Sequence, residues 1–196
     1  MAEPVDRRAQ ILAAAVRVFA RQGFEATRMS DVATEAGVAY GLVYHYFGSK
    51  DAVLLAVFRE AWGRLLSAIA LAEETGKTAV EQLSLVVRIV LRVWRDEPDL
   101  VRLLVREVTR SSHISAELDE IGRAFTSLEQ IVRRGQAEGV FRPSLDARLA
   151  AWMLYGALEE VLTGWVLGQL PDDPESVAAA EHEIVSTFVA GLGARV

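Results

Sequence analysis

The chain has 196 residues, of which 52% are hydrophobic and 24% are charged. This apolar content supports a sizeable core and excludes an intrinsically disordered chain. The absence of cysteine excludes disulfides, thiolate metal sites and a cysteine nucleophile. His45, His113 and His182 are too far apart for a paired-ligand motif, so neither a metal nor another cofactor is expected.

The length predicts one domain, or a small domain joined to a larger one. No apolar run approaches the roughly 18 residues of a membrane span. The first ten residues, MAEPVDRRAQ, also lack the apolar stretch of a signal peptide. We therefore expect a cytoplasmic protein without a membrane partner.

The net charge of −6 is unevenly distributed along the chain. Residues 1–50 carry six basic and five acidic side chains, whereas residues 51–196 carry 15 basic and 22 acidic ones. The first quarter therefore has a net charge of +1 and can approach phosphate groups, whereas the acidic remainder is poorly suited to nucleic acid.

Periodicity predicts an all-α fold of about nine helices, because no segment alternates with the period of a strand. The expected helices cover approximately residues 5–22, 28–36, 40–47, 50–74, 78–96, 98–110, 115–138, 145–170 and 175–192. Gly and Pro punctuate these stretches, and Pro98 is expected to open the sixth helix. Residues 1–49 are expected to form one domain and residues 50–196 a second.

Residues 27–50, TRMSDVATEAGVAYGLVYHYFGSK, have the spacing of a helix-turn-helix, with Gly37 in the turn. The second helix of this motif enters the major groove of DNA. Thr27 is a plausible N-cap of the first helix. Lys50 lies at a helix N-terminus, where an ammonium and backbone N–H groups suit an anion.

The second helix carries side chains that can contact DNA. Tyr40, Tyr44 and His45 offer hydrogen-bonding groups, and Leu42 can reach a thymine methyl. The alternative is that the large apolar and aromatic residues of this helix belong to the core, and we expect this for Val43, Tyr46 and Phe47. Arg28 is weaker evidence for a phosphate contact, because a lone arginine is often solvated.

Residues 7–55 resemble the DNA-binding domain of the TetR family of transcriptional regulators, through ILAAAVRVFARQGFEATRMSDVATEAGV and GLVYHYFGSK. The resemblance implies a homodimeric, all-helical regulator whose first three helices bind a palindromic operator in double-stranded DNA. The residues expected at the DNA are Thr27, Arg28, Ser30, Tyr40, Gly41, Leu42, Tyr44, His45 and Lys50.

Three positions depart from the family pattern. Ala39 stands where a capping Ser or Thr is usual, which costs about 1 kcal/mol of helix stability. Tyr40 and Leu42 stand where Lys and Thr are common. The operator sequence therefore cannot be taken from relatives.

The C-terminal part is similar to the fatty-acid-degradation (FadR-type) repressors of this family, over residues 84–121 and 144–167. This resemblance implies a long-chain acyl-CoA as effector. The chain offers apolar residues for an acyl chain and two arginine stripes, 88/92/95 and 102/106/110, for phosphates. The residues expected at the effector are Leu66, Ile89, Arg92, Val93, Arg102, Leu103, Arg106, Phe125, Leu128 and Leu158.

The alternative for these residues is a packed core with solvated arginines paired to Asp96, Asp99 and Glu107. The last two helices are expected to supply a dimer interface, because a single helix-turn-helix needs a two-fold mate to read a palindrome. Its expected residues are Trp152, Tyr155, Glu159, Leu162, Val166, Ile184 and Phe188, although some of them must also pack within the subunit.

The sequence thus predicts a repressor that acyl-CoA releases from DNA. A TetR-type regulator of efflux or another pathway is the alternative, with an aromatic or cationic ligand held by Trp62, Trp94, Glu159 and Glu160. A helical enzyme lacks support, because no metal-ligand spacing, P-loop, dinucleotide fingerprint or G-x-S-x-G occurs. A lipid-binding module without DNA binding leaves the cluster of Tyr44, His45 and Lys50 unexplained.

Overall fold

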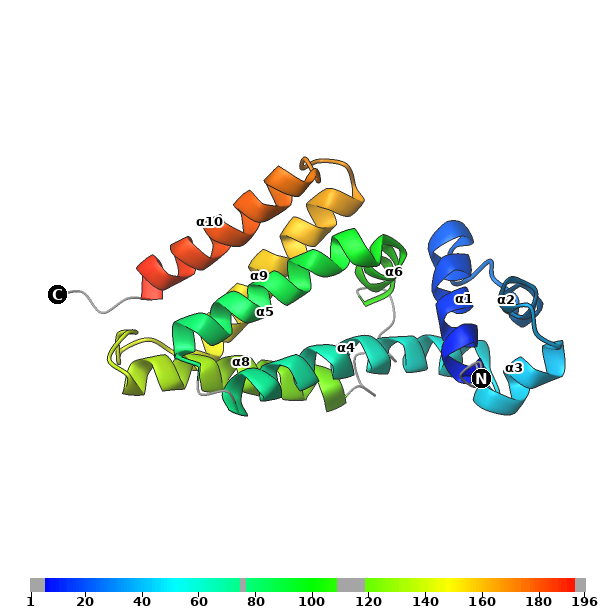
Figure 1. The fold of residues 1–196 in the computed structure, drawn as a ribbon, viewed down its shortest axis with the longest axis horizontal. Helices are drawn as coiled ribbons and strands as arrows, with labels where there is room; N and C mark the ends of the chain where they lie inside the picture. Colours follow the sequence, from blue (N-terminus) through cyan, green and yellow to red (C-terminus); the bar gives the residue numbers. More distant parts are fainter. Residues whose placement is uncertain (1–5, 75–76, 109–118, 193–196) are drawn as a thin grey trace, which may run out of the picture. The chain divides into compact units, whose positions relative to one another are not determined.

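A computed structural model describes residues 6–74, 77–108 and 119–192 of the chain (Figure 1). These residues form nine helices and no β-strand, which confirms the predicted all-α class. The helices are α1 (Arg7–Gln22), α2 (Met29–Ala36), α3 (Tyr40–Phe47), α4 (Lys50–Glu74), α5 (Ala79–Asp96), α6 (Pro98–Val108), α8 (Asp119–Ala137), α9 (Ala147–Val166) and α10 (Pro174–Leu192). The expected end of the sixth helix at 110, the start of the next at 115 and His113 lie outside the described residues.

The helices form two compact units, Met1–Ala61 with Glu97–Ala116 and Trp62–Asp96 with Glu117–Val196. Helix α4 continues from the first unit into the second. Compactness thus groups α6 with the N-terminal helices, whereas sequence patterning assigned all residues after 49 to the second domain.

The first unit is built on the apolar face of α1. Ile11, Ala15 and Phe19 are buried, as their four-residue spacing predicts. The Asp6 carboxylate caps the helix by accepting the Arg8 and Ala9 N–H groups at 2.9 and 3.2 Å. This cap and the apolar stripe make α1 a platform on which α2 and α6 pack.

Helices α2 and α3 are joined by a tight turn at Gly37, whose φ of 63° lies in the left-handed region that favours glycine (Figure 1). Arg28, rather than Thr27, is the N-cap of α2. The Asp31 carboxylate accepts the Arg28 N–H at 2.9 Å and so replaces the expected threonine cap. The turn and this cap fix the angle at which α3 leaves α2.

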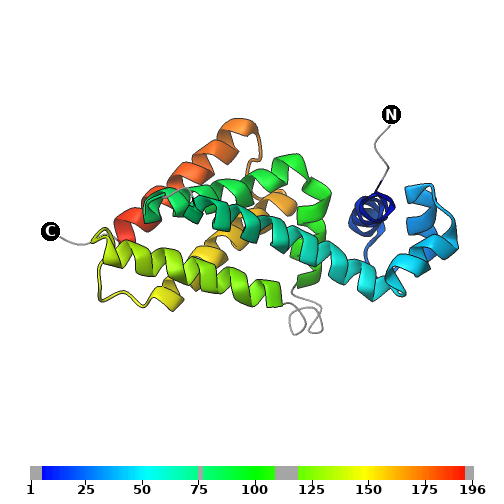
Figure 2. The same cartoon turned by 60° about the horizontal axis from the view of Figure 1, so that its bottom comes forward.

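The second unit contains α5, α8, α9 and α10 with the C-terminal part of α4. Helix α5 packs against α8, α9 and α10, and α8 also packs against α9 (Figure 2). Trp165 donates from Nε1 to the Pro171 carbonyl at 3.0 Å, and Trp94 donates to the Asp172 carboxylate at 3.2 Å. These two indoles anchor the loop between α9 and α10 to the helical core.

Helix α9 ends at Val166, four residues before its expected end. Gly168 has a φ of 67°, and the N–H groups of Gln169 and Leu170 turn back to the Gly164 carbonyl. This left-handed closure satisfies a carbonyl at the helix end. No helix in the described part of the chain is long and apolar enough to cross a membrane.

Candidate functional site

The exposed side of α3 carries two tyrosines one helical turn apart. Tyr40 is 53% exposed and Tyr44 is 42% exposed, and their ring centroids are 4.9 Å apart. A hydrogen bond with Tyr44 raises the pKa of the Tyr40 hydroxyl, so this phenol is a neutral donor at pH 7. Val43, on the neighbouring inner face of α3, is fully buried, and its burial leaves the tyrosine pair facing outward.

Most other residues expected at the DNA are also accessible. Arg28, Ser30, Gly41 and His45 are exposed, whereas Leu42 is half-buried. Ala39 caps α3 without a side-chain hydrogen bond, as its methyl group requires. These residues form an accessible surface across α2 and α3, and their contact with DNA stays a prediction.

Thr27 does not fit the expectation of a side-chain contact with DNA. Its side chain is 3% exposed, and its hydroxyl donates to the Gly23 carbonyl at 2.7 Å. The same oxygen accepts from the Gln22 amide at 3.2 Å. Because the hydroxyl is satisfied inside the protein, Thr27 closes the loop between α1 and α2 instead of facing phosphate.

Lys50 is likewise engaged within the first unit. Its Nζ donates to the carbonyls of Phe24 and Glu25 at 2.7 and 3.2 Å. The same ammonium lies 4.4 Å from the centre of the Phe24 ring. Lys50 thus ties the start of α4 to the loop after α1, and we expect this role rather than the predicted contact with phosphate.

One aromatic residue expected in the core is on the surface. Tyr46 is 43% exposed, whereas Val43 is buried and Phe47 is half-buried. Residues 43 and 47 are four apart and share the inner face of this short helix, which leaves residue 46 at its edge. Apolarity alone misplaced this side chain.

The arginines expected at the effector belong to different units. Arg106 belongs to the first unit, where Nη1 donates to the Ala20 carbonyl at 3.2 Å. Arg102, in the same unit, pairs with Asp99 at 2.9 Å. Arg92 lies exposed on α5 in the second unit. Arg106 therefore fastens α6 to α1, and its contact with a phosphate of the effector stays a prediction.

The apolar residues expected at the effector are partly packed. Leu128 and Leu158 of the second unit are buried, as is Leu103 of the first. Leu66, Ile89, Val93 and Phe125 of the second unit are half-buried. The second unit therefore combines a packed core with accessible apolar side chains, and acyl-chain binding by these residues stays a prediction.

A row of aromatic rings crosses the second unit and was not anticipated as a group. Trp62 of α4 stacks on Tyr155 of α9 at 6.2 Å, and Tyr155 meets Phe125 of α8 at 4.9 Å. Phe125 stacks on Trp152 at 4.2 Å. Burial raises the pKa of the Tyr155 hydroxyl to about 12, with a smaller contribution from Glu159. Only tertiary packing could reveal this row, because its members are up to 93 positions apart.

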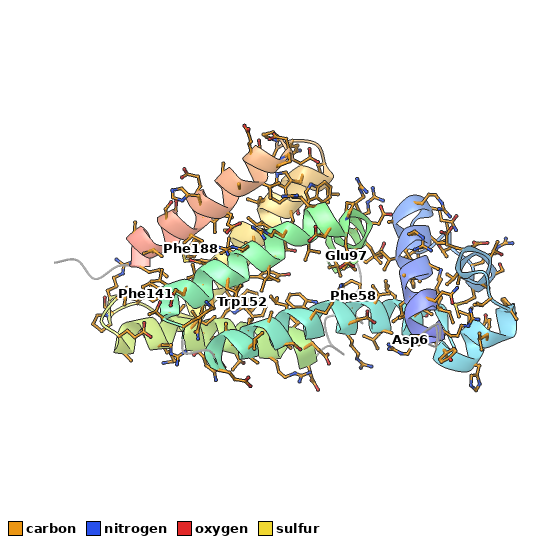
Figure 3. All side chains as sticks on the ribbon, viewed as in Figure 1. Asp6, Phe58, Glu97, Phe141, Trp152 and Phe188 are labelled. Atoms are coloured by element: carbon orange, nitrogen blue, oxygen red, sulfur yellow. The ribbon has the colours of Figure 1, made fainter. Side chains whose placement is uncertain are left out.

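The residues expected at a dimer interface lie at least partly open. Trp152 is 52% exposed and is labelled in Figure 3, as is Phe188 of α10. Tyr155, Glu159, Leu162, Val166, Ile184 and Phe188 are half-buried. Sequence reasoning missed Leu149 and Met153 of α9, each 58% exposed, and Leu167 at the C-cap of this helix, which is 61% exposed. Their spacings of four and fourteen residues, about one and four helical turns, were the signal that could have found them.

Helices α1 to α3 form a three-helix unit in which α2 and α3 make a helix-turn-helix, and α3 exposes aromatic side chains. This arrangement defines a helix-turn-helix DNA-binding protein. Residues 11–57 match bacterial regulatory proteins of the tetR family, and residues 58–187 match the C-terminal region of YsiA-like proteins. The chain belongs to the TetR family. It is a TetR-type repressor of a class that binds DNA and a small-molecule effector, and its relatives are regulators rather than enzymes.

Known proteins resemble the chain over nearly its whole length. The fatty acid metabolism regulator protein of Bacillus subtilis (strain 168) is 29% identical over 185 residues, which cover 93% of this chain and 94% of that protein. The fatty acid degradation regulator FadR of Bacillus halodurans superimposes with a TM-score of 0.84 at 28% identity, covering 94% of this chain and 98% of that one. The transcriptional regulator FadR of Bacillus subtilis, in complex with stearoyl-CoA, superimposes with a TM-score of 0.82 at 28% identity. The match covers 93% of this chain and 98% of that one.

Proposed function

We propose that this protein is a dimeric repressor of fatty-acid-degradation genes that long-chain acyl-CoA releases from a palindromic operator. The observation that carries the proposal is the similarity across more than nine-tenths of the chain to a regulator whose structure contains stearoyl-CoA. Because that similarity includes the second unit, it supports the effector as well as the DNA-binding fold. A regulator of chromosomal genes is expected to work in the cytoplasm.

The proposed dimer is supported by the open apolar stripe of α9. Leu149, Met153 and Leu167 expose large apolar side chains, which a soluble monomer rarely places in a row. A two-fold dimer would present two copies of α3 to successive major grooves, about 34–36 Å apart. The Tyr40–Tyr44 pair of each copy would then meet one half of the palindrome.

The proposed coupling runs through α4, because this helix has contacts in both units. Lys50 at its start is bound to the loop after α1, and Trp62 stacks on Tyr155 in the second unit. An effector that prefers the form with unfavourable spacing of the recognition helices would weaken DNA binding. A coupling free energy of about 1–3 kcal/mol changes the DNA affinity about 5–150-fold.

The test begins with an operator selected by the protein from a randomised duplex pool. Fluorescence anisotropy of the protein–operator complex is then followed during titration with acyl-CoAs of increasing chain length. We expect long-chain acyl-CoAs to release the DNA at lower concentration than short-chain ones, because more apolar surface is buried per added methylene. Intact operator binding with no release by any acyl-CoA would refute the effector.

A cationic effector is the alternative, and the structure weakens it. Its expected cage included Trp94, which is 6% exposed, stacks on Trp165 and donates to Asp172. Glu159 is half-buried, and burial, with a smaller contribution from Glu160, raises the pKa of its carboxyl group. Release of DNA by cationic dyes in the same titration would favour this alternative.

A further inference from the structure

An open hollow of about 640 Å³ lies between α8 and the start of α9 in the second unit. This volume is within the range of small-molecule sites, about 300–1,000 Å³. Phe125, Glu129 and Arg133 line it from α8, and Arg148 and Trp152 line it from α9. Two aromatic rings and two guanidinium groups therefore face one space of ligand size.

The hollow offers a stacking surface for a flat aromatic group. The Trp152 ring stacks on Phe125 with a centroid distance of 4.2 Å and an interplanar angle of 20°. Because Trp152 nevertheless remains 52% exposed, Phe125 supports it from one side and leaves part of the indole open. An aromatic side chain held in this way is a preformed platform for a nucleobase.

The charges beside this platform suit an anion. Arg148 is exposed, and no ion pair of Arg148 is found among the described residues. Arg133 is paired with Glu129, whose Oε1 lies 2.6 Å from Nη2. The remaining acid, Asp146, is occupied as the N-cap of α9, where it accepts the Leu149 N–H at 3.0 Å. Arg148 is thus the group best placed to meet a phosphate, with Arg133 as its neighbour.

The aromatic row connects this hollow to the interior of the second unit. From Trp152 and Phe125 it continues through Tyr155 to Trp62. The Trp62 Nε1–H is buried and has no hydrogen-bond partner among the described residues. Because a buried unpaired donor is costly, the inner end of the row calls for an acceptor such as a carbonyl oxygen.

We infer that the hollow binds the nucleotide end of an acyl-CoA, with adenine stacked on Trp152 and phosphate bound by Arg148 and Arg133. The pantetheine arm follows the aromatic row inward, and one of its carbonyl oxygens accepts from Trp62. This inference rests on the proposed function. It assigns Trp152, which was expected at the dimer interface, to the effector, and it adds a site that the arginines expected from sequence did not identify.

The test compares stearoyl-CoA with S-stearoyl-pantetheine, which keeps the acyl chain and thioester but lacks the nucleotide. Each compound is titrated against the protein–operator complex of the wild type, Trp152→Ala and Arg148→Gln. We expect each variant to need about tenfold more stearoyl-CoA for half release, and an unchanged concentration of S-stearoyl-pantetheine. Calorimetry with coenzyme A alone should show binding to the wild type that is weakened about as much in both variants.

Matched controls are Arg123→Gln, an exposed arginine of α8 outside the hollow, and Leu71→Ala, an apolar side chain of α4 that is 59% exposed. Both should respond to stearoyl-CoA like the wild type. Equal loss of response to both thioesters, an unchanged response of the hollow variants to stearoyl-CoA, or a monomeric Trp152→Ala protein would overturn the inference. Failure of stearoyl-CoA to release the wild type would instead overturn the proposed function itself.

Discussion

Lys50 carries an ammonium group that makes two hydrogen bonds within the first unit. Its contacts with the Phe24 and Glu25 carbonyls and the Phe24 ring join the start of α4 to the loop after α1. Thr27 closes the same loop from its other side. Two residues that sequence assigned to the DNA therefore hold the motif in place.

We expect Lys50→Met to lower the free energy of unfolding by about 1–2 kcal/mol, because two hydrogen bonds from a charged donor are lost. The dependence of log K for DNA on log salt should keep its slope, since no phosphate contact is removed. Arg28→Gln is the matched comparison, and its slope should fall by about one. A similar loss of slope in Lys50→Met would show that Lys50 binds phosphate.

Glu159 should make stability depend on pH. Burial, and then Glu160, raises its pKa, so the folded protein favours the protonated carboxyl. Below the unfolded pKa both states are protonated and no stability is lost; as pH rises through the folded pKa, ionisation destabilises the fold. Glu159→Gln should therefore raise the melting temperature at pH 8 and have little effect at pH 4.

Thermal unfolding of both proteins at the two pH values measures this difference. Glu183→Gln is the control, because Glu183 is exposed on α10. An equal change for Glu159→Gln at pH 4 and pH 8 would contradict the assignment.

At the scale of the element, α3 has an exposed face and a buried face. Substitutions on the exposed face should change operator binding, and substitutions on the buried face should change stability. Tyr40 and Tyr44 are exposed, and Val43 is fully buried. Tyr40→Ala with Tyr44→Ala should weaken operator binding at least about tenfold, because each lost contact to DNA removes about 1–3 kcal/mol. The free energy of unfolding should change by less than about 0.5 kcal/mol for each exposed site.

Val43→Ala is the converse control. It should lower the free energy of unfolding by about 1–3 kcal/mol through a cavity under α3, while folded protein keeps its operator affinity. Denaturant unfolding and anisotropy with the selected operator measure the two effects separately. Undiminished DNA binding by the folded double-tyrosine variant would contradict the assignment of this face.

At the scale of the whole molecule, operator binding depends on the proposed two-fold association. Met153→Glu would place like charges within the exposed stripe of α9 in both copies, so we expect sedimentation to show a monomer. Affinity for the full palindrome should then fall toward that for a half-site. Leu71→Glu, at an equally exposed position on α4, should remain dimeric. A dimeric Met153→Glu protein would place the interface elsewhere.

The sequence alone identified the helices, the turn at Gly37 and the outward face of α3, because each depends on residues within a few positions of one another. A four-residue apolar repeat specifies one helical face, and a left-handed residue between two helices specifies a turn. The resemblance of residues 7–55 to the TetR family rested on the same local features.

Only the tertiary structure showed which polar side chains already have partners within the protein and which remain available for DNA or effector. Arg106 meets the Ala20 carbonyl across 86 positions, and Lys50 meets Phe24 across 26. The hollow likewise combines side chains of α8 and α9 whose periodicity gives no sign of their pairing. Helical spacing shows on which face of a helix a side chain lies. Only tertiary packing brings a distant carbonyl, aromatic ring or carboxylate close enough to pair with that side chain.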